Sequence, residues 1–251
     1  MSSLRKMLSI IDLFKANQSI ITIDDVIKSL DISAPTAYRY IKELCNSGLI
    51  VKVSSSEYTI GPKIIKLDYQ IRTSDPIIVA GKIVMQELVF ATGCEVLLSN
   101  IYNDEVLNIY SEVPMNYNNA LTYRRGNPHP IFKGATSKII LANLPKRKLQ
   151  KLYSENSTTI AEENLGETWE EFYDQLYQYK RAGYCITHGE LDNGMTGIAA
   201  PVFYNGNSIS GSITIVLPTN RLHVYNTEKL VELLLIAADK INQLTIESNN
   251  E

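Results

Sequence analysis

Apolar side chains in residues 33–49 recur at the spacing of one face of a helix. They stand at positions i, i+4, i+7 and i+8, and they are Ala37, Ile41, Leu44 and Cys45. This spacing predicts a helix with one buried side. Ser33 is expected to cap its start through the hydroxyl, and Pro35 fits the first turn, where a missing N–H is tolerated. Gly48 can adopt the positive φ that ends a helix.

The opposite face of this predicted helix is polar and partly cationic. Its residues are Pro35, Arg39, Lys42 and Asn46, flanked by Thr36 and Tyr38. A short helix that buries one side and presents cationic, hydrogen-bonding groups on the other can enter the major groove of DNA. An ordinary surface helix has the same periodicity, so this segment alone leaves both interpretations open.

The segments before this helix predict a helix-turn-helix. Helical spacing runs through residues 2–16, where the apolar positions are Leu4, Met7, Leu8, Ile11 and Phe14. A second short helix is expected to begin at Thr22 or Asp24, and a tight turn at 31–33 leads into the third. Helix, short helix, turn and helix is the helix-turn-helix order.

The segments after Gly48 predict a hairpin. Two runs rich in β-branched residues, 49–53 and 57–60, surround three serines. Two short strands with a polar tip form the wing of a winged helix. Lys52 and the serines, Ser55 among them, are positioned there to contact phosphates.

The rest of the chain alternates helical and strand patterns. Helices are predicted at 63–73, 77–90, 133–144, 146–153, 169–181 and 228–246. Strands are predicted at 94–101, 106–113, 121–124, 184–190, 197–204 and 208–217. Loops are predicted at 125–130 and 156–166, and a frayed tail at 247–251. This order predicts an α+β fold, in which helices flank an antiparallel sheet.

Three local signals refine this second region. Asn103-Asp104 and Asn205-Gly206 are turn sequences, and the second predicts a two-residue hairpin turn. Thr227 is expected to cap the last helix. Asp75-Pro76 ends the helix at 63–73, which we interpret as a linker; a simple connector is the alternative.

Composition limits the class of protein. The chain has 251 residues, of which 45% are hydrophobic and 20% charged, as in globular proteins. We expect neither a membrane span nor a signal peptide, because no apolar run approaches about 20 residues. Three cysteines are few and odd in number, so a reduced cytoplasmic protein is the simplest interpretation.

Net charge differs between the two ends of the chain. Residues 1–75 hold 10 basic and 8 acidic side chains, whereas the remaining residues hold 14 and 19. The small positive excess therefore belongs to the segment with the helix-turn-helix, as phosphate binding requires.

The first 61 residues resemble the N-terminal domain of IclR-type transcriptional regulators. The resemblance rests on Pro-Thr-Ala-Tyr-Arg-Tyr-Ile-Lys-Glu-Leu-Cys-Asn-Ser-Gly-Leu-Ile at 35–50 and on Tyr-Thr-Ile-Gly at 58–61. It implies a winged helix-turn-helix whose DNA contacts are Ser33, Pro35, Thr36, Tyr38, Arg39, Lys42, Lys52 and Ser55. In this family the first helix and the linker helix help to form the dimer.

A second resemblance to the same family lies at 126–142 and 183–202. The family's Gly–Pro loop and its Ala-x-x-Lys-x-x-Leu-Ala helix match residues 126–142, with Ser137 where glycine is common, and Gly-Ile-Ala-Ala-Pro-Val stands at 197–202. The resemblance implies a GAF-like effector domain with a ligand cavity. The implied effector-binding residues are Gly134, Ala135, Thr136, Thr187, Glu190, Met195, Gly197 and Thr214.

Physical reasoning supports an anion at one end of this predicted site. Gly134, Ala135 and Thr136 would lie at a helix N-terminus, where free N–H groups and the helix dipole suit a carboxylate. We expect Ala135 and Thr136 to hold the anionic group and Met195 to shape an apolar wall. Val216 stands where some relatives carry hydroxyl residues. The alternative is that these residues only cap a helix and fill a core.

Enzyme and metal signatures are lacking. The three histidines have no metal-binding spacing, and no nucleophile elbow, P-loop or Rossmann pattern is present. Cys185 and His188 are three residues apart on a predicted strand and should face opposite sides, which argues against a catalytic dyad. We therefore expect no metal, no cofactor and no catalysis.

Together these patterns predict a transcriptional regulator whose affinity for a double-stranded DNA operator is controlled by a small metabolite that bears a carboxylate. The expected organisation is a DNA-binding domain at 1–61, a linker helix at 62–75 and an effector domain at 76–251. We expect a cytoplasmic homodimer or tetramer without membrane contact. The alternative hypothesis is a sensor or enzyme whose N-terminal domain serves only protein contacts.

Overall fold

The structure is a computed structural model, and it describes residues 2–15, 17–102, 104–115, 121–122, 125–204 and 208–247. Packing divides the chain into two compact units, residues 1–75 and 76–251. Each unit is described below by itself.

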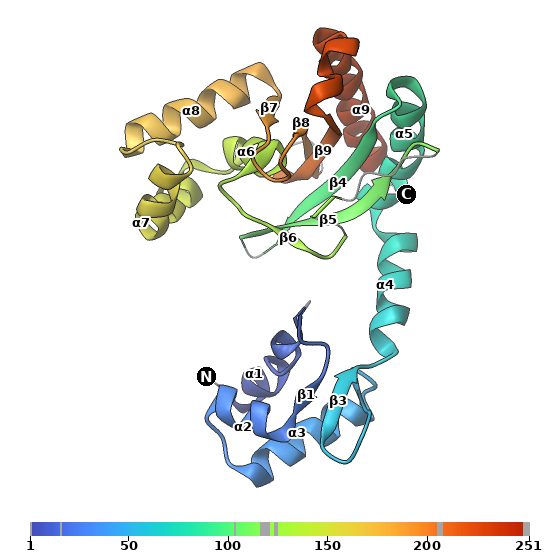
Figure 1. The fold of residues 1–251 in the computed structure, drawn as a ribbon, viewed down its shortest axis with the longest axis vertical. Coiled ribbons are helices and arrows are strands. Elements are labelled where there is room, and N and C mark those ends of the chain that lie inside the picture. Colours follow the sequence, from blue (N-terminus) through green and yellow to red (C-terminus); the bar gives the residue numbers. More distant parts are fainter. Residues whose placement is uncertain are drawn as a thin grey trace. The chain divides into compact units, whose positions relative to one another are not determined.

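The first unit is a winged helix-turn-helix (Figure 1). Its helices are α1 (Ser3–Leu8), a 3₁₀ turn η1 (Ile11–Leu13), α2 (Ile23–Leu30), α3 (Ala34–Asn46) and α4 (Lys63–Ser74). Its strands are β1 (Ile21–Thr22), β2 (Ile50–Lys52) and β3 (Glu57–Ile60), and they form an antiparallel sheet in the order β1-β3-β2. The wing predicted at 49–60 is therefore the β2–β3 hairpin.

The core of this unit contains the apolar stripe that the sequence predicts for α3. Ala37, Ile41 and Leu44 are buried, together with Tyr40, whereas Cys45 is only partly buried. They pack against Ile10, Ile21, Ile23, Val26, Ile50 and Tyr58. Burial of one face of α3 leaves its opposite face to solvent.

Helix 2–16 was predicted too long. The α-helix ends at Leu8, because the Ser9 hydroxyl donates to the Lys6 carbonyl and competes with the helical hydrogen bonds. The chain then turns and places Ile10, which is fully buried, in the core. Ala16 lies outside the described residues.

The caps of the next two helices differ in kind. Thr22 begins α2 with a capping box: its hydroxyl accepts from the Asp25 N–H at 3.2 Å, and the Asp25 carboxylate accepts from the Thr22 N–H at 2.8 Å. Ser33 occupies the N-cap position of α3, but its hydroxyl bonds to Thr36 Oγ1 at 3.0 Å. The prediction that this hydroxyl bonds to the backbone is therefore wrong.

Backbone packs directly on backbone where the wing ends and α4 begins. The Gly61 N–H donates to the Leu49 carbonyl at 2.7 Å, and the Lys63 N–H donates to the Gly48 carbonyl at 3.2 Å. A Cβ on Gly61 would lie 2.2 Å from the Gly48 oxygen, so only glycine fits there.

The second unit is an antiparallel sheet with helices on both faces (Figure 1). Its strands are β4 (Glu95–Tyr102), β5 (Glu105–Glu112), β6 (Pro128–His129), β7 (Cys185–His188), β8 (Met195–Tyr204) and β9 (Ser208–Pro218), in the order β6-β5-β4-β9-β8-β7. Its helices are α5 (Pro76–Thr92), α6 (Gly134–Asn143), α7 (Lys146–Glu162), α8 (Trp169–Ala182), the 3₁₀ turn η2 (Thr219–Val224) and α9 (Thr227–Glu247).

Alternation along the strands separates two apolar layers. On β4 the side chains of Val96 and Leu98 join a large core with α5 and α9, whereas Leu97 points to the other face. On β9 Ile215 joins the same large core, and Val216 joins Leu97. The second face is the one on which α6 packs, and it carries the candidate site.

The α7 region differs most from the sequence prediction. A short helix at 146–153 and a loop at 156–166 were expected, but α7 continues to Glu162 with a kink at Asn156, whose φ is −138°. The Asn156 side chain donates to the Leu152 carbonyl at 2.9 Å, which is a local alternative to regular helical bonding. Ile160, fully buried, holds the second half in the core.

Other boundaries in this unit also needed correction. Leu121 and Thr122 are not in a strand, and residues 123–124 lie outside the described ones. The predicted loop at 125–130 contains β6, in which His129 pairs with Val106. The last helix is capped by Asn226, which accepts from the Lys229 N–H at 3.1 Å, and Thr227 is already helical.

The predicted β8–β9 hairpin is present, with Tyr204 opposite Ser208. Its turn residues Asn205-Gly206, like Asn103 of the other predicted turn and the last residues of the tail, lie outside the described residues. Among the helices that the structure describes, none has the length and apolarity needed to cross a bilayer.

Candidate functional site

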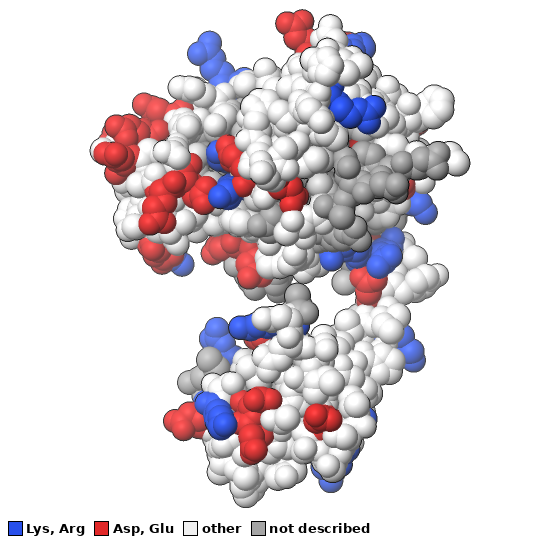
Figure 2. All heavy atoms as spheres, viewed as in Figure 1, with Lys and Arg blue, Asp and Glu red and all other residues white. Residues whose placement is uncertain are grey.

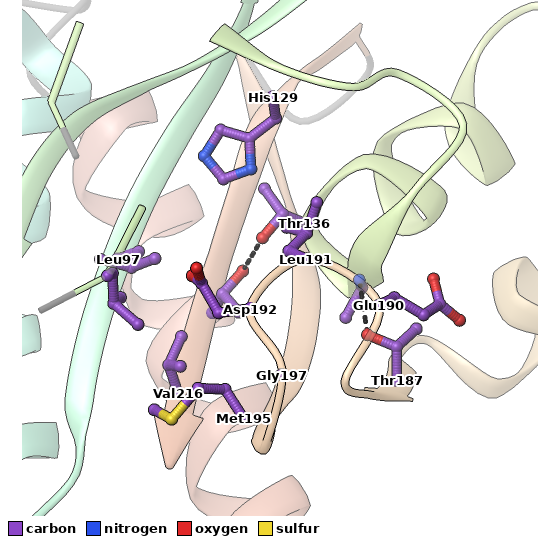
Figure 3. Close-up of a pocket in the computed structure, with 13 residues that line it drawn as sticks. Leu97, His129, Thr136, Thr187, Glu190, Leu191, Asp192, Met195, Gly197 and Val216 are labelled. Atoms are coloured by element: carbon purple, nitrogen blue, oxygen red, sulfur yellow. Dashed lines mark hydrogen bonds between the residues drawn. The ribbon is translucent and has the colours of Figure 1, made fainter. Parts of the chain in front are cut away.

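A pocket lies on the α6 face of the sheet in the second unit (Figure 3). Its walls come from β4, β6, β7, β8, β9, the start of α6, Leu121 before β6 and the segment between β7 and β8. The lining residues are Leu97, Leu121, His129, Ala135, Thr136, Thr187, Glu190, Leu191, Asp192, Met195, Gly197, Thr214 and Val216. About 40 Å³ is open to the centre of a water molecule, so the pocket is small in this structure.

Seven of the eight effector residues implied by the resemblance line this pocket. They are Ala135, Thr136, Thr187, Glu190, Met195, Gly197 and Thr214. The eighth, Gly134, lies at its edge and starts α6 with a φ of +82°. Residues from widely separated parts of the chain therefore meet in one place.

The N–H groups at the start of α6 are already bound by the chain itself. The Gly134 N–H donates to Glu190 Oε2 at 2.8 Å, and the Ala135 N–H donates to Thr187 Oγ1 at 3.0 Å. The buried Lys138 ammonium pairs with Glu190 Oε1 at 2.7 Å. Glu190 thus supplies the negative charge that the helix dipole favours at this position.

Two threonine hydroxyls meet inside the pocket. Thr136 Oγ1 and Thr214 Oγ1 lie 3.0 Å apart, and both side chains are buried. The surrounding side chains of Leu97, Met195 and Val216 form an apolar wall. An apolar wall with a few convergent hydroxyls is the usual composition of a small-molecule site.

The structure adds pocket residues that were not predicted from sequence. His129 is buried, and burial lowers its pKa to about 4, so it lines the pocket as the neutral imidazole at pH 7. Asp192 points into the pocket in Figure 3, and its carboxylate accepts from the Thr122 N–H at 3.2 Å. Leu97, Leu121 and Leu191 were also missed.

Of these additional pocket residues, only Leu97 has a sequence pattern that indicates its position. Leu97 alternates with Val96 and Leu98 on a predicted strand, so its position on the other face could have been inferred. Leu191 and Asp192 lie in an irregular segment, where no periodicity indicates which side chain points inward. His129 belongs to a strand of two residues that has too short a pattern to detect.

In the first unit, the predicted DNA-contacting residues lie on exposed surface. Ser33, Pro35, Tyr38, Arg39 and Lys42 of the α3 region and Lys52 and Ser55 of the wing are exposed, and Thr36 is half-buried. The Arg39 guanidinium carbon lies 5.6 Å from the centre of the Tyr40 ring, a distance typical of a cation–π contact. The cationic face of α3 is therefore available to a partner.

The charge of the second unit has the opposite sign. In the view of Figure 2 acidic side chains gather over α7 and α8. This agrees with the excess of acidic residues after position 75. This difference in charge favours the first unit, and not the second, as the part that binds DNA phosphates.

The described residues offer no group of three or more His, Cys, Asp or Glu side chains that could hold a metal ion. Cys185 is buried, and burial raises the pKa of its thiol to about 12. His188 is exposed on the other side of β7, where its Nδ1 lies 2.9 Å from Thr196 Oγ1. Cys185 and His188 therefore do not form a thiol–imidazole pair.

Residues 70–243 match the family model described as the bacterial transcriptional regulator IclR C-terminal domain, and they make up more than half of the chain. The chain belongs to the IclR family. Residues 4–51 of this IclR-family protein match a second model, the winged helix-turn-helix DNA-binding domain. It is a DNA-binding transcriptional regulator with a C-terminal effector-binding domain.

Similar proteins agree over most of the chain. The regulator KdgR of Dickeya chrysanthemi is 26% identical over 226 residues, covering 88% of this chain and 73% of KdgR. The crystal structure of an IclR transcriptional regulator from a Silicibacter species superposes with a TM-score of 0.81 at 18% identity, covering 98% and 96% of the two chains.

A third similar protein was solved with a ligand. It is an IclR homolog from Microbacterium hydrocarbonoxydans complexed with 4-hydroxybenzoate, with a TM-score of 0.75, 18% identity and coverage of 97% and 99%. At these identities the solved structures establish the shared fold.

Proposed function

We propose that this IclR-family regulator binds a two-fold symmetric operator as a homodimer or a higher oligomer, with α3 of each protomer in the major groove. The observation that carries the proposal is the exposed cationic face of α3 inside a winged helix-turn-helix. Arg39 and Lys42 contact bases or phosphates, assisted by Ser33, Pro35, Thr36 and Tyr38. Lys52 and Ser55 of the wing contact the backbone.

Exposed apolar side chains support the proposed oligomer. On α4 Ile65 and Tyr69 are 72% and 67% exposed, and on α1 Leu4 is 69% exposed. Apolar surface of this extent is often covered by a partner chain. The protein acts where its operator is, in the cytoplasm.

The effector that we propose is a small, largely apolar metabolite with a carboxylate. The apolar wall and the Thr136–Thr214 hydroxyl pair support such a ligand, and the 4-hydroxybenzoate bound by the Microbacterium protein has this chemistry. Ala135 and Thr136 at the start of α6 hold its polar end: the Thr136 hydroxyl binds it directly, and the Ala135 N–H binds it once the ligand displaces Thr187 Oγ1. Met195 contacts its apolar body. The effector alters operator affinity because it binds two arrangements of the protein with different affinities. We propose no catalysis, so the effector is released unchanged.

A gel-shift series with the promoter fragment beside the protein's own gene tests DNA binding. We expect binding that falls steeply with salt, because phosphate contacts release counterions. Arg39→Ala should abolish operator binding while the fold and ligand binding persist. Arg181→Ala, which removes an exposed arginine of α8, is the matched control and should bind as the parent does.

Effector candidates are tested in the same gel shift. Small carboxylates, with 4-hydroxybenzoate as the first probe, should change the promoter affinity of the parent and of Arg181→Ala alike. No preference for promoter over bulk DNA would remove the regulatory proposal. Turnover of a probe by the purified protein would favour the sensor or enzyme hypothesis.

A further inference from the structure

The segment between β7 and β8 has the geometry of a small flap. Residues 189–194 leave the sheet after His188 and return at Met195, and the Gly189 N–H donates to the Met195 carbonyl at 2.7 Å, which closes the base. Gly189 and Gly194 have φ values of +66° and +76°. Two glycines at positive φ therefore stand at the two ends of the flap, where a change of backbone angle costs least.

Three successive side chains of this flap line the pocket: Glu190, Leu191 and Asp192. They point in different directions (Figure 3). Asp192 is directed into the pocket, whereas the Glu190 carboxylate points away from it and toward the start of α6. The flap therefore forms a wall of the pocket. At its base the Gly194 carbonyl accepts from the Thr219 N–H at 2.7 Å, and beyond the base the flap is held from two sides.

On one side, the flap is fastened to α6. Glu190 accepts from the Gly134 N–H at 2.8 Å and pairs with the Lys138 ammonium at 2.7 Å. Leu191 covers Gly134 so closely that a Cβ there would lie 2.5 Å from Leu191 Cδ1. These contacts hold the flap down without a covalent bond.

On the other side, Asp192 fastens the flap to the chain before β6. Its two carboxylate oxygens lie 3.2 and 3.3 Å from the Thr122 nitrogen. Between the two fastenings, the side chains of residues 190–192 are only half-buried, and Asn193 and Gly194 are exposed. A segment with few buried contacts and exposed hydrogen bonds opens more readily than the sheet beneath it.

The pocket requires such an opening. About 40 Å³ of the pocket is open to the centres of water molecules, which is far below the roughly 300–1,000 Å³ of typical ligand pockets. A metabolite therefore needs more room than this structure provides. Apart from Leu121, the other walls of the pocket come from the sheet and α6, whose lining residues are mostly buried and belong to regularly hydrogen-bonded elements. Displacement of the flap leaves the hydrogen bonds within α6 and between the strands of the sheet in place.

We propose that residues 189–194 are a lid over the pocket, that they move about Gly189 and Gly194, and that Glu190 and Asp192 are the two latches that keep the lid closed. This inference rests on the proposed role of the pocket as the effector site. Glu190 and Asp192 are positioning residues of the lid, and an effector reaches the pocket when the latches release. The lid thereby sets how fast the regulator responds.

The lid can be tested without a known effector, by chemical labelling of the pocket. Val216 is 7% exposed and lines the pocket, so Val216→Cys places a thiol inside it in the full-length protein. Its reaction rate with iodoacetamide, followed by mass spectrometry of the separate peptides, measures opening. The native thiols of Cys94 and Cys185, each 1% exposed, report in the same sample whether the unit itself opens.

Three second substitutions in this background form a matched set. Glu190→Ala and Asp192→Ala each remove one latch. Glu163→Ala removes another glutamate that pairs with a lysine near α6, Lys133 at 3.3 Å, but that lies outside the lid. Because release of a hydrogen bond to a charged group changes an opening equilibrium by roughly tenfold or more, the latch variants should label about tenfold faster, and the control as the parent does.

Unchanged labelling of the pocket thiol in both latch variants would overturn the proposal, and so would equal acceleration by Glu163→Ala. Parallel acceleration at Cys94 and Cys185 would show that the whole unit opens instead. Because Asp192→Ala strands no buried charge, it decides the matter if Glu190→Ala is unstable. Failure of the gel shifts would leave this result untouched, so the two proposals can fail separately.

Discussion

His129 links the stability of the effector unit to pH. Its side chain is 4% exposed, and burial lowers its pKa from 6.5 to about 4. Between these two values the unfolded chain binds a proton that the folded chain does not, so stability rises with pH across this window and is lost as the pH falls.

We expect the effector unit to be about 2 kcal/mol less stable at pH 5 than at pH 7 on account of this histidine. Urea unfolding of the parent and of His129→Gln at both pH values measures the effect. The readout is the difference between pH values, so a change in absolute stability does not obscure it. An equal pH difference in the two proteins would contradict the assignment.

Ser137 is a buried residue whose hydroxyl has no hydrogen-bond partner among the described residues. Since a buried unpaired hydroxyl is destabilising, Ser137→Ala should raise the free energy of unfolding by about 1 kcal/mol. Ser99→Ala is the control: the Ser99 hydroxyl donates to Asn108, so its loss should lower stability by a similar amount. Denaturant midpoints for the two variants that move in the same direction would refute this explanation.

At the scale of elements, the N-cap of α9 lies one residue before the position that the sequence predicts. Thr227 and Asn226 are adjacent and both suit an N-cap, but only Asn226 accepts the Lys229 N–H. Asn226→Ala should therefore destabilise the effector unit by about 1 kcal/mol, and Thr227→Ala by less than about 0.5 kcal/mol. Thermal unfolding of the two variants side by side gives the comparison. Equal losses of stability would contradict the assignment of the N-cap to Asn226 alone.

Elements with a sustained period were predictable from sequence. The stripe of α3, the pairing of β8 with β9 and the helix α8 follow from repeated spacing over ten or more residues. Elements decided by one local competition were not. The Ser9 hydroxyl ends α1 early, the Asn156 amide kinks α7 without ending it, and β6 exists only through its pairing with β5.

The pocket follows the same division. Its residues on α6, β8 and β9 belong to segments that carry the resemblance, so they could be named in advance. The lid residues Leu191 and Asp192 could not, because nothing periodic places an irregular segment over a cavity. Glu190 was expected to contact the ligand; its bonds to Gly134 and Lys138 are the basis for the lid proposal.

At the scale of the whole molecule, the division of charge and the proposed dimer predict a particular footprint. Two protomers should protect two half-sites centred about 10 base pairs apart, or a multiple of that, arranged as an inverted repeat. Hydroxyl-radical footprinting of the promoter measures the spacing. A single protected half-site without symmetry would contradict the dimeric arrangement on DNA.

Gly61 couples the linker helix α4 to the recognition helix α3. Because the wing, the end of α3 and the first turn of α4 meet backbone on backbone at this glycine, no side chain lies between them to absorb a twist. We therefore expect α4, the wing and the end of α3 to move together, so that a rotation of α4 also rotates the recognition helix. A methyl group at that point, as in Gly61→Ala, would force these backbone segments apart and weaken the coupling between α4 and α3.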